Sequence, residues 1–83
     1  MEYDKLSVAI GNRIRSLRNK MGLSQEDFSG IVDSDRTYIC KIENGTKNIT
    51  IKKICIICES CGLSLKDFFD DESFSQIFFK TKE

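Results

Sequence analysis

The sequence predicts an all-α domain, a compact bundle of five short helices within one chain of 83 residues. Apolar residues recur at spacings of three and four, and the segments that carry them begin at capping residues such as Ser, Thr or Asp. The chain contains no proline, so no residue rigidly breaks a helix. Hydrophobic residues make up 40% of a chain long enough for one core, which predicts a single domain over residues 1–83.

The first helix is expected over residues 4–21. Its apolar side chains fall on one stripe of the helix. The stripe consists of Leu6, Ile10, Ile14, Leu17 and Met21. Gly22 follows directly and is a favourable residue for ending a helix.

A second, short helix is expected to begin after Ser24. Ser24 can cap it, with Asp27 three residues further on, as in a capping box. The helix should end at residues 30–31. Residues 32–34 then predict a tight turn.

A third helix is expected over residues 35–44, with either Ser34 or Asp35 as its cap. Ile39 and Ile42 are spaced to face inward. The Asn-Gly pair at its end stops the helix.

Two further helices are expected in the C-terminal half. Thr50 can cap a helix over residues 51–61, which Gly62 closes. Ser64 can cap a fifth helix beginning one residue later. Two alternatives stay open beyond it, because the helix can either continue through the acidic residues 70–72 or stop there.

Basic residues gather in the middle of the chain. The formal net charge is zero, but residues 11–53 contain nine Lys or Arg and five Asp or Glu, a net charge of +4. Residues 54–83 have a net charge of −3. The local field and not the total charge decides which face can meet a phosphate backbone.

Two short helices joined by a tight turn are the geometry of helix-turn-helix DNA recognition. The second helix of such a pair lies in the major groove, where Arg can grip guanine and Thr can contact a base edge. The side chains expected to read bases are Arg36, Thr37, Tyr38 and Cys40. The alternative is that the charged residues of this helix only solvate its surface.

Two motifs carry a family resemblance. Residues 22–28 (GLSQEDF) and 42–45 (IENG) resemble the Cro/cI-type (XRE) helix-turn-helix family, and the likeness extends over about residues 8–69. Residues 35–39 (DRTYI) and 48–51 (NITI) most resemble the controller proteins of restriction–modification systems. The resemblance implies a lambda-repressor-like fold and a transcriptional regulator that binds an inverted-repeat operator as a homodimer. It implies action on the regulator's own promoter and that of the endonuclease, with RNA polymerase as a further partner.

The resemblance also implies individual roles. Contacts to the DNA backbone are implied for Gln25, Lys41, Asn44, Thr46, Lys47 and Asn48. Gln25 would in addition brace the recognition helix. Arg18 and Glu43 would form a structural ion pair beneath the motif. Many controller proteins carry a basic residue where Asn44 stands, which implies a weaker phosphate clamp or a different operator.

The cysteines are the main competing signal. Cys55, Cys58 and Cys61 are spaced like a metal or iron–sulfur ligand run. On a helix, however, the first and last of these point about 120° apart, so they do not converge on one ion. Buried thiols pack as small apolar groups, which is the favoured interpretation, and no metal or cofactor is expected. Metal ligation and a redox-sensing thiol stay as alternatives, with Cys40 able to face DNA.

The tail is rich in phenylalanine. Phe68 is the best candidate for the core. Phe74, Ile77 and Phe78 are spaced to share one helical face, which predicts a dimer interface within residues 65–83. The alternative is a tail that folds back on its own domain.

Several classes of protein are disfavoured. The chain has no histidine, the usual general base, and no phosphate-binding glycine loop, so an enzyme is not expected. No apolar run is long enough to span a bilayer, and residues 1–7 lack a secretory signal, which predicts a cytoplasmic location. The alternatives to a controller protein are a phage-type repressor or antitoxin-like regulator and, from another class, a cysteine-based metal or redox sensor.

Overall fold

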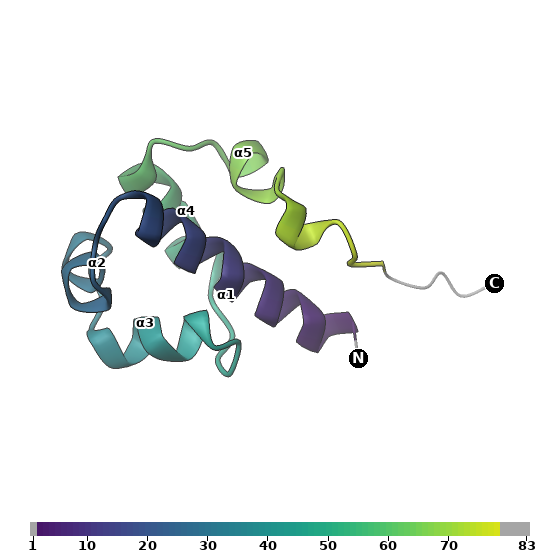
Figure 1. Ribbon diagram of the computed structural model, residues 1–83, viewed down its shortest axis with the longest axis horizontal. Helices are drawn as coiled ribbons and strands as arrows, with labels where there is room; N and C mark the ends of the chain where they lie inside the picture. Colours follow the sequence, from purple (N-terminus) through teal and green to yellow (C-terminus); the bar gives the residue numbers. More distant parts are fainter. Residues whose placement is uncertain (1, 79–83) are drawn as a thin grey trace.

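The computed structural model describes residues 2–78, with side chains from Asp4 onward, and is all-helical over that range. Figure 1 shows the helices folded around α1, with α2 and α3 to one side of it and the C-terminal segment along another. The elements are α1 (Glu2–Lys20), α2 (Gln25–Ile31), α3 (Arg36–Glu43), α4 (Ile51–Cys61), α5 (Leu65–Phe69) and the 3-10 turn η1 (Glu72–Phe74). The predicted five-helix class is confirmed. Within the described range, no helix is long and apolar enough to cross a membrane.

Side-chain caps begin four of the helices, as the sequence predicts. Ser24, Thr50 and Ser64 each accept a hydrogen bond from the backbone N–H three residues on, at 3.0, 3.1 and 3.0 Å. Asp35 caps α3 in the same way at 2.7 Å, which decides between Ser34 and Asp35. These bonds satisfy amide groups that the first turn of a helix leaves unpaired.

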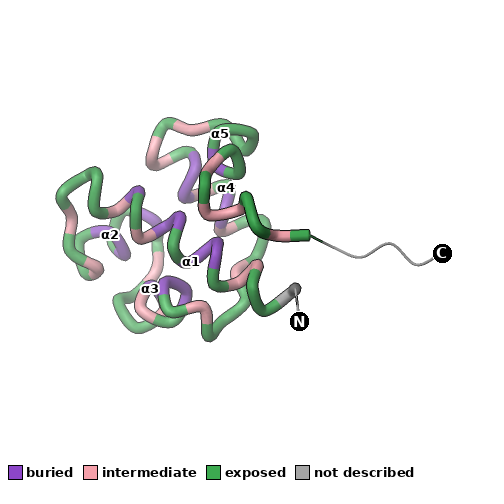
Figure 2. The backbone as a smooth tube through the Cα atoms, turned by 45° about the vertical axis from the view of Figure 1, so that its right-hand side comes forward, coloured by how far each residue is buried: buried purple, intermediate pink, exposed green. Residues whose placement is uncertain are grey.

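The core draws on all five α-helices. Figure 2 shows the buried positions gathered where the helices face one another. The residues with at most 1% of their surface exposed include Ile14, Phe28, Val32, Ile39, Ile42, Ile57 and Phe68. The expected inward positions of α3 and the expected core role of Phe68 are therefore confirmed. Met21 is a correction, since α1 ends at Lys20 and Met21 is largely exposed.

α1 and α3 cross at very short range because Gly11 lies at their contact. A Cβ atom at Gly11 would overlap the Ile42 carbonyl oxygen and approach that of Glu43 to 2.8 Å. Gly45, just past α3, has φ 73° and would place a Cβ atom 2.9 Å from Val8. Glycine at both positions allows the two backbones to approach.

The expected helical dimer face in the tail is not formed. α5 ends at Phe69, and Asp71 caps η1 through a 3.0 Å bond from the Ser73 amide. Phe74, Ile77 and Phe78 therefore do not share a helical face. Phe74 instead packs on Phe69 and Phe68, with ring centroids 5.1 and 6.2 Å apart, so this part of the tail folds back on its own domain.

Arg13 explains why the helix stops. Its guanidinium donates to the carbonyl oxygens of Phe68 at 2.8 Å and Asp67 at 2.9 Å, and to the Asp71 carboxylate at 3.1 Å. These carbonyls at the end of α5 are thus satisfied by α1 and not by a further helical turn. Phe79 and the rest of the expected interface range lie outside the described residues.

Candidate nucleic-acid interface

α2 and α3 form the predicted pair of short helices. Val32 closes α2, and its amide bonds to the Phe28 carbonyl at 3.1 Å. Asp33 then adopts a left-handed conformation, φ 56°, which turns the chain toward α3. Phe28, Val32 and Ile39 are fully buried, so the pair is anchored to the core from both helices and from the turn.

The outer side of α3 carries most of the residues expected to read bases. Arg36 and Thr37 are exposed, whereas Tyr38 and Cys40 are half-buried. A polar groove runs from this helix to the following loop and is lined by Asp35, Thr37, Tyr38, Lys41 and Lys47. The groove brings together two expected base readers and two expected backbone contacts; Arg36 and Cys40 lie outside its lining.

Two ammonium groups lie near the Tyr38 ring. The Nζ atoms of Lys47 and Lys53 each lie 5.8 Å from the centroid of its ring, within cation–π range. Burial raises the pKa of the Tyr38 phenol, so the hydroxyl keeps its proton at neutral pH and can donate a hydrogen bond.

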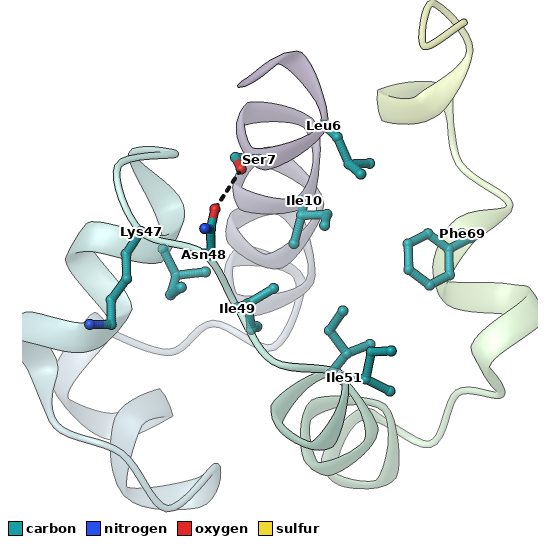
Figure 3. Close-up of a pocket in the computed structure, with 10 residues that line it drawn as sticks. Leu6, Ser7, Ile10, Lys47, Asn48, Ile49, Ile51 and Phe69 are labelled. Carbon is teal, nitrogen blue, oxygen red and sulfur yellow. Dashed lines mark hydrogen bonds between the residues drawn. The ribbon is translucent and has the colours of Figure 1, made fainter. Parts of the chain in front are cut away.

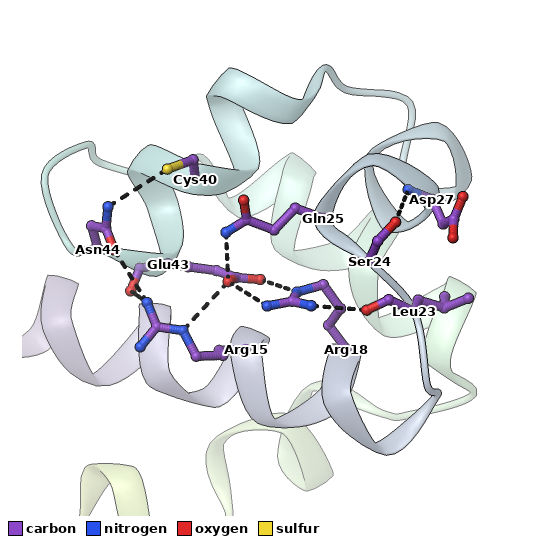
Figure 4. A network of polar contacts seen from close by, with 9 residues as sticks. All are labelled: Arg15, Arg18, Leu23, Ser24, Gln25, Asp27, Cys40, Glu43 and Asn44. Atoms are coloured by element: carbon purple, nitrogen blue, oxygen red, sulfur yellow. Dashed lines mark hydrogen bonds and ion pairs between the residues drawn. The ribbon is translucent and has the colours of Figure 1, made fainter.

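A buried carboxylate lies directly beneath the motif. The Glu43 side chain is 0% exposed and receives the Arg18 guanidinium at 2.7 and 3.0 Å (Figure 4). Burial by itself would raise the pKa of Glu43, but hydrogen bonds from Arg18, Gln25 and Arg15 hold that pKa below its usual value. Arg18 also donates to the Leu23 carbonyl at 2.8 Å, so one ion pair ties α1 to both the start of the motif and the end of α3.

Two further side chains complete this network. Gln25 donates its amide to Glu43 at 3.1 Å, which is the geometry of a brace between α2 and α3. Arg15 donates to the Glu43 carboxylate at 3.4 Å and to the Asn44 amide oxygen at 3.1 Å. Sequence reasoning missed Arg15, although it lies three residues before Arg18 and hence on the same helical face.

Residues 44–50 lead from α3 to α4 past the polar groove. Asn44 and Lys47 are exposed, and the Asn44 amide also donates to the Cys40 sulfur at 3.6 Å. The Thr46 hydroxyl donates a hydrogen bond to the Lys41 carbonyl oxygen at 3.2 Å, and the Asn48 side-chain oxygen accepts one from the Ser7 hydroxyl at 3.4 Å. The last two side chains therefore hold the loop to its own domain in this structure.

An apolar pocket opens beside that loop. Figure 3 shows Leu6 and Ile10 of α1, Ile49 of the loop, Ile51 of α4 and Phe69 of α5 around it. Ile51 is 76% exposed and Phe69 is 41% exposed. The sequence predicts exposed apolar side chains in the tail. The structure shows further exposed apolar side chains outside residues 74–78, at the start of α4 and the end of α5.

The cysteines of α4 have three different environments. Cys58 is buried in the core, as its favoured interpretation predicts, and burial raises its pKa. Cys55 is exposed. Cys61 is half-buried, with its sulfur 3.8 Å from the sulfur of Met21.

Comparison with known proteins shows which family has this arrangement of helices. Residues 14–68 match the model of the helix-turn-helix family, and the chain belongs to that family. More particularly, it is similar to the control protein C.MunI of a Mycoplasma species, with 37% identity over 67 residues, 80% of this chain and 90% of that protein.

Solved structures agree. The restriction–modification controller protein C.AhdI of Aeromonas hydrophila superposes with a TM-score of 0.76 and 28% identity, covering 83% of this chain and all of that one. The controller protein C.Esp1396I, solved as a tetramer with its natural 35 base-pair operator, superposes with a TM-score of 0.71 and 34% identity over 78% of this chain and 86% of that one.

Proposed function

We propose that this protein is a sequence-specific DNA-binding transcriptional regulator, the controller protein of a restriction–modification system. The single observation that carries the proposal is the outer side of α3, where Thr37, Tyr38 and Lys41 line one polar groove with Lys47. Hydroxyl groups beside ammonium groups suit a surface that reads base edges and phosphates together. The function requires binding alone and no catalytic step.

The support beneath α3 favours the same function. A recognition helix must hold its side chains in a fixed register on the duplex. The buried Glu43 receives Arg18 from α1 and Gln25 from α2, so the end of α3 is tied to two other helices. In the proposed complex Gln25 keeps this brace and also approaches a phosphate, while Arg36 reads a base at the other end of α3.

The controller assignment rests on the relatives named above. The family resemblance implies that the DNA partner is an inverted-repeat operator beside the protein's own gene and that of the endonuclease, and C.Esp1396I was solved with its natural 35 base-pair operator. RNA polymerase is a proposed second partner, since a regulator bound next to a promoter lies within its reach. Such a regulator acts in the cytoplasm, where those promoters lie.

The protein is proposed to bind as a homodimer. Phe78, at 68% exposed, and the half-buried Ile77 remain available for the interface, but Phe74 is engaged within its own chain. The exposed apolar groups of Ile51 and Phe69 extend the candidate surface to the pocket of Figure 3. Covering such a surface in a twofold contact would place two recognition helices at a fixed spacing.

Selection from random duplex DNA tests the proposed function. The protein should enrich a two-part, near-palindromic sequence with half-site centres about one helical turn apart, or a small multiple of it. That sequence should occur upstream of the protein's own gene, and the bound protein should protect it from cleavage in footprinting. Enrichment of no sequence at all, or of unpaired half-sites only, contradicts the proposal.

A further inference from the structure

Lys53 belongs to α4, outside both helices of the motif, yet its side chain reaches the turn between them. Its Nζ donates to the carbonyl oxygens of Val32 at 3.0 Å and Asp33 at 2.9 Å. The same Nζ lies 5.8 Å from the centroid of the Tyr38 ring on α3. One ammonium group therefore contacts the end of α2, the turn and the third residue of the recognition helix.

Each contact answers a specific need. The end of a helix carries unpaired carbonyl groups and partial negative charge, which a cation stabilises. Asp33 adopts φ 56°, a left-handed conformation that Asp tolerates better than most residues other than glycine, and bonds to its backbone stabilise it further. The face of an aromatic ring attracts a cation, so Tyr38 is held against α4 by the group that also holds the turn.

The direction of these bonds separates Lys53 from the lysines that face DNA. Two of its hydrogen bonds point into the protein, to the backbone of the turn, and its side chain is half-buried. Lys47 shares the contact with the Tyr38 ring, but it is exposed, lines the polar groove, and its described contacts do not include the turn. Loss of Lys53 should thus alter both the turn and the placement of Tyr38, whereas loss of exposed Lys52, for which no contact with the turn or with Tyr38 is described, should alter only the charge that phosphates meet.

We propose that Lys53 is a positioning residue for sequence discrimination, acting through the turn and Tyr38 and not through contact with a phosphate. The proposal deepens the proposed function and rests on it. According to this proposal, a side chain of α4 contributes to the ratio of the affinities for operator and other DNA.

The test compares Lys53→Met with Lys52→Met, its exposed neighbour, which removes the same charge without the contacts to the turn. Binding of the full chain is measured by fluorescence anisotropy on the selected operator and on a shuffled duplex of equal composition. Lys53→Met should lower the ratio of the two affinities by about tenfold, the equivalent of one charged hydrogen bond. Lys52→Met should weaken both duplexes alike or leave both unchanged, and Lys53→Arg, which keeps the donors, should recover most of the ratio.

A double-mutant cycle separates positioning from general destabilisation. If Lys53 acts through Tyr38, the change in ratio caused by Lys53→Met should largely vanish in a Tyr38→Ala background. Circular dichroism confirms that each variant is folded at the assay temperature; if Lys53→Met is not, Lys53→Ala, which also removes the donors and has the highest helix propensity, takes its place. An unchanged ratio in the folded variant, or equal losses in both Tyr38 backgrounds, overturns the inference. A wild-type protein that does not distinguish the two duplexes contradicts the proposed function instead.

Discussion

Arg13 donates its Nε hydrogen to the carbonyl oxygen of Phe68 at 2.8 Å, which joins the first helix to the end of α5 across 55 positions of sequence. The guanidinium also lies 5.8 Å from the centroid of the Phe68 ring. α1 therefore has two roles. Arg18 supports the helix-turn-helix motif, and Arg13 holds the end of α5, where the tail begins.

Arg13→Ala should destabilise the protein by about 1–3 kcal/mol, because it leaves two carbonyl groups at the end of α5 without their donor. Urea unfolding followed by circular dichroism measures the change in the free energy of unfolding. Arg36→Ala is the matched control, since Arg36 is exposed and its loss should change that free energy very little. Equal stability of the two variants would mean that the Arg13 bonds contribute nothing net.

Glu43 should make stability depend on acid. Its pKa is lowered in the folded protein, so its stabilising contribution is complete above the unfolded-state value of 4.5 and is lost as the pH falls through the folded-state value. The free energy of unfolding of the wild type should accordingly fall below about pH 4.5. Glu43→Gln should lower stability at pH 7 by about 3 kcal/mol, since it leaves Arg18 without a charged partner, and should flatten the acid dependence.

Asp71→Asn is the control for that pH profile. The pKa of Asp71 is also lowered, chiefly by hydrogen bonds from Ser73, so it adds to the acid dependence in the same direction. Its removal should reduce the slope while leaving the part that depends on Glu43. A Glu43→Gln protein with the wild-type profile between pH 2 and pH 7 would show that other carboxylates set it.

Gly11→Ala and Gly30→Ala should have opposite effects. A methyl group at Gly11 overlaps backbone oxygens of α3 that cannot move independently, and the cost should be about 2 kcal/mol or more. Nothing described lies within 4 Å of a Cβ atom at Gly30, which is inside α2, so alanine there should stabilise by about 0.5–1 kcal/mol. Thermal unfolding of both variants tests the close crossing of α1 and α3, and a neutral Gly11→Ala would contradict it.

Arg36→Ala and Lys47→Ala should separate base reading from phosphate binding. Arg36→Ala should lose about 1–3 kcal/mol of discrimination at one base pair of each half-site. Lys47→Ala should weaken binding to all sequences alike and reduce the slope of log affinity against log salt concentration by about one unit. Competition with operator variants at several salt concentrations distinguishes the two, and identical behaviour would exclude the assigned roles.

Ile51→Lys should disrupt the proposed dimer without unfolding the monomer, because Ile51 is 76% exposed. Sedimentation should show a shift to the monomer, and operator affinity should fall with it, since only a dimer presents two recognition helices together. Ile31→Lys is the control, at a half-exposed apolar position on α2. If Ile51→Lys stays dimeric and binds the operator fully, the interface lies elsewhere.

Local chemistry in the sequence determined where the helices begin and which of their faces are buried. Ser24, Thr50 and Ser64 cap the helices that they predict, because a cap bonds to an amide only two or three residues away. The inward positions of Ile39 and Ile42 follow from helical spacing alone. The exposed side of α3, which carries the proposed recognition residues Arg36 and Thr37, could be predicted for the same reason, whereas the partial burial of Tyr38 and Cys40 could not.

Tertiary structure decided what depends on partners distant in sequence. The spacing of Phe74, Ile77 and Phe78 suits a helix, yet Arg13 binds the carbonyls that such a helix would need, and the chain turns into η1 instead. Lys53 shows no local sign of its role, because the carbonyls that it contacts lie 20 and 21 positions earlier. Periodicity and capping are interactions within a few residues, whereas the tail, the support of the turn and the apolar face depend on which helices meet in the folded protein.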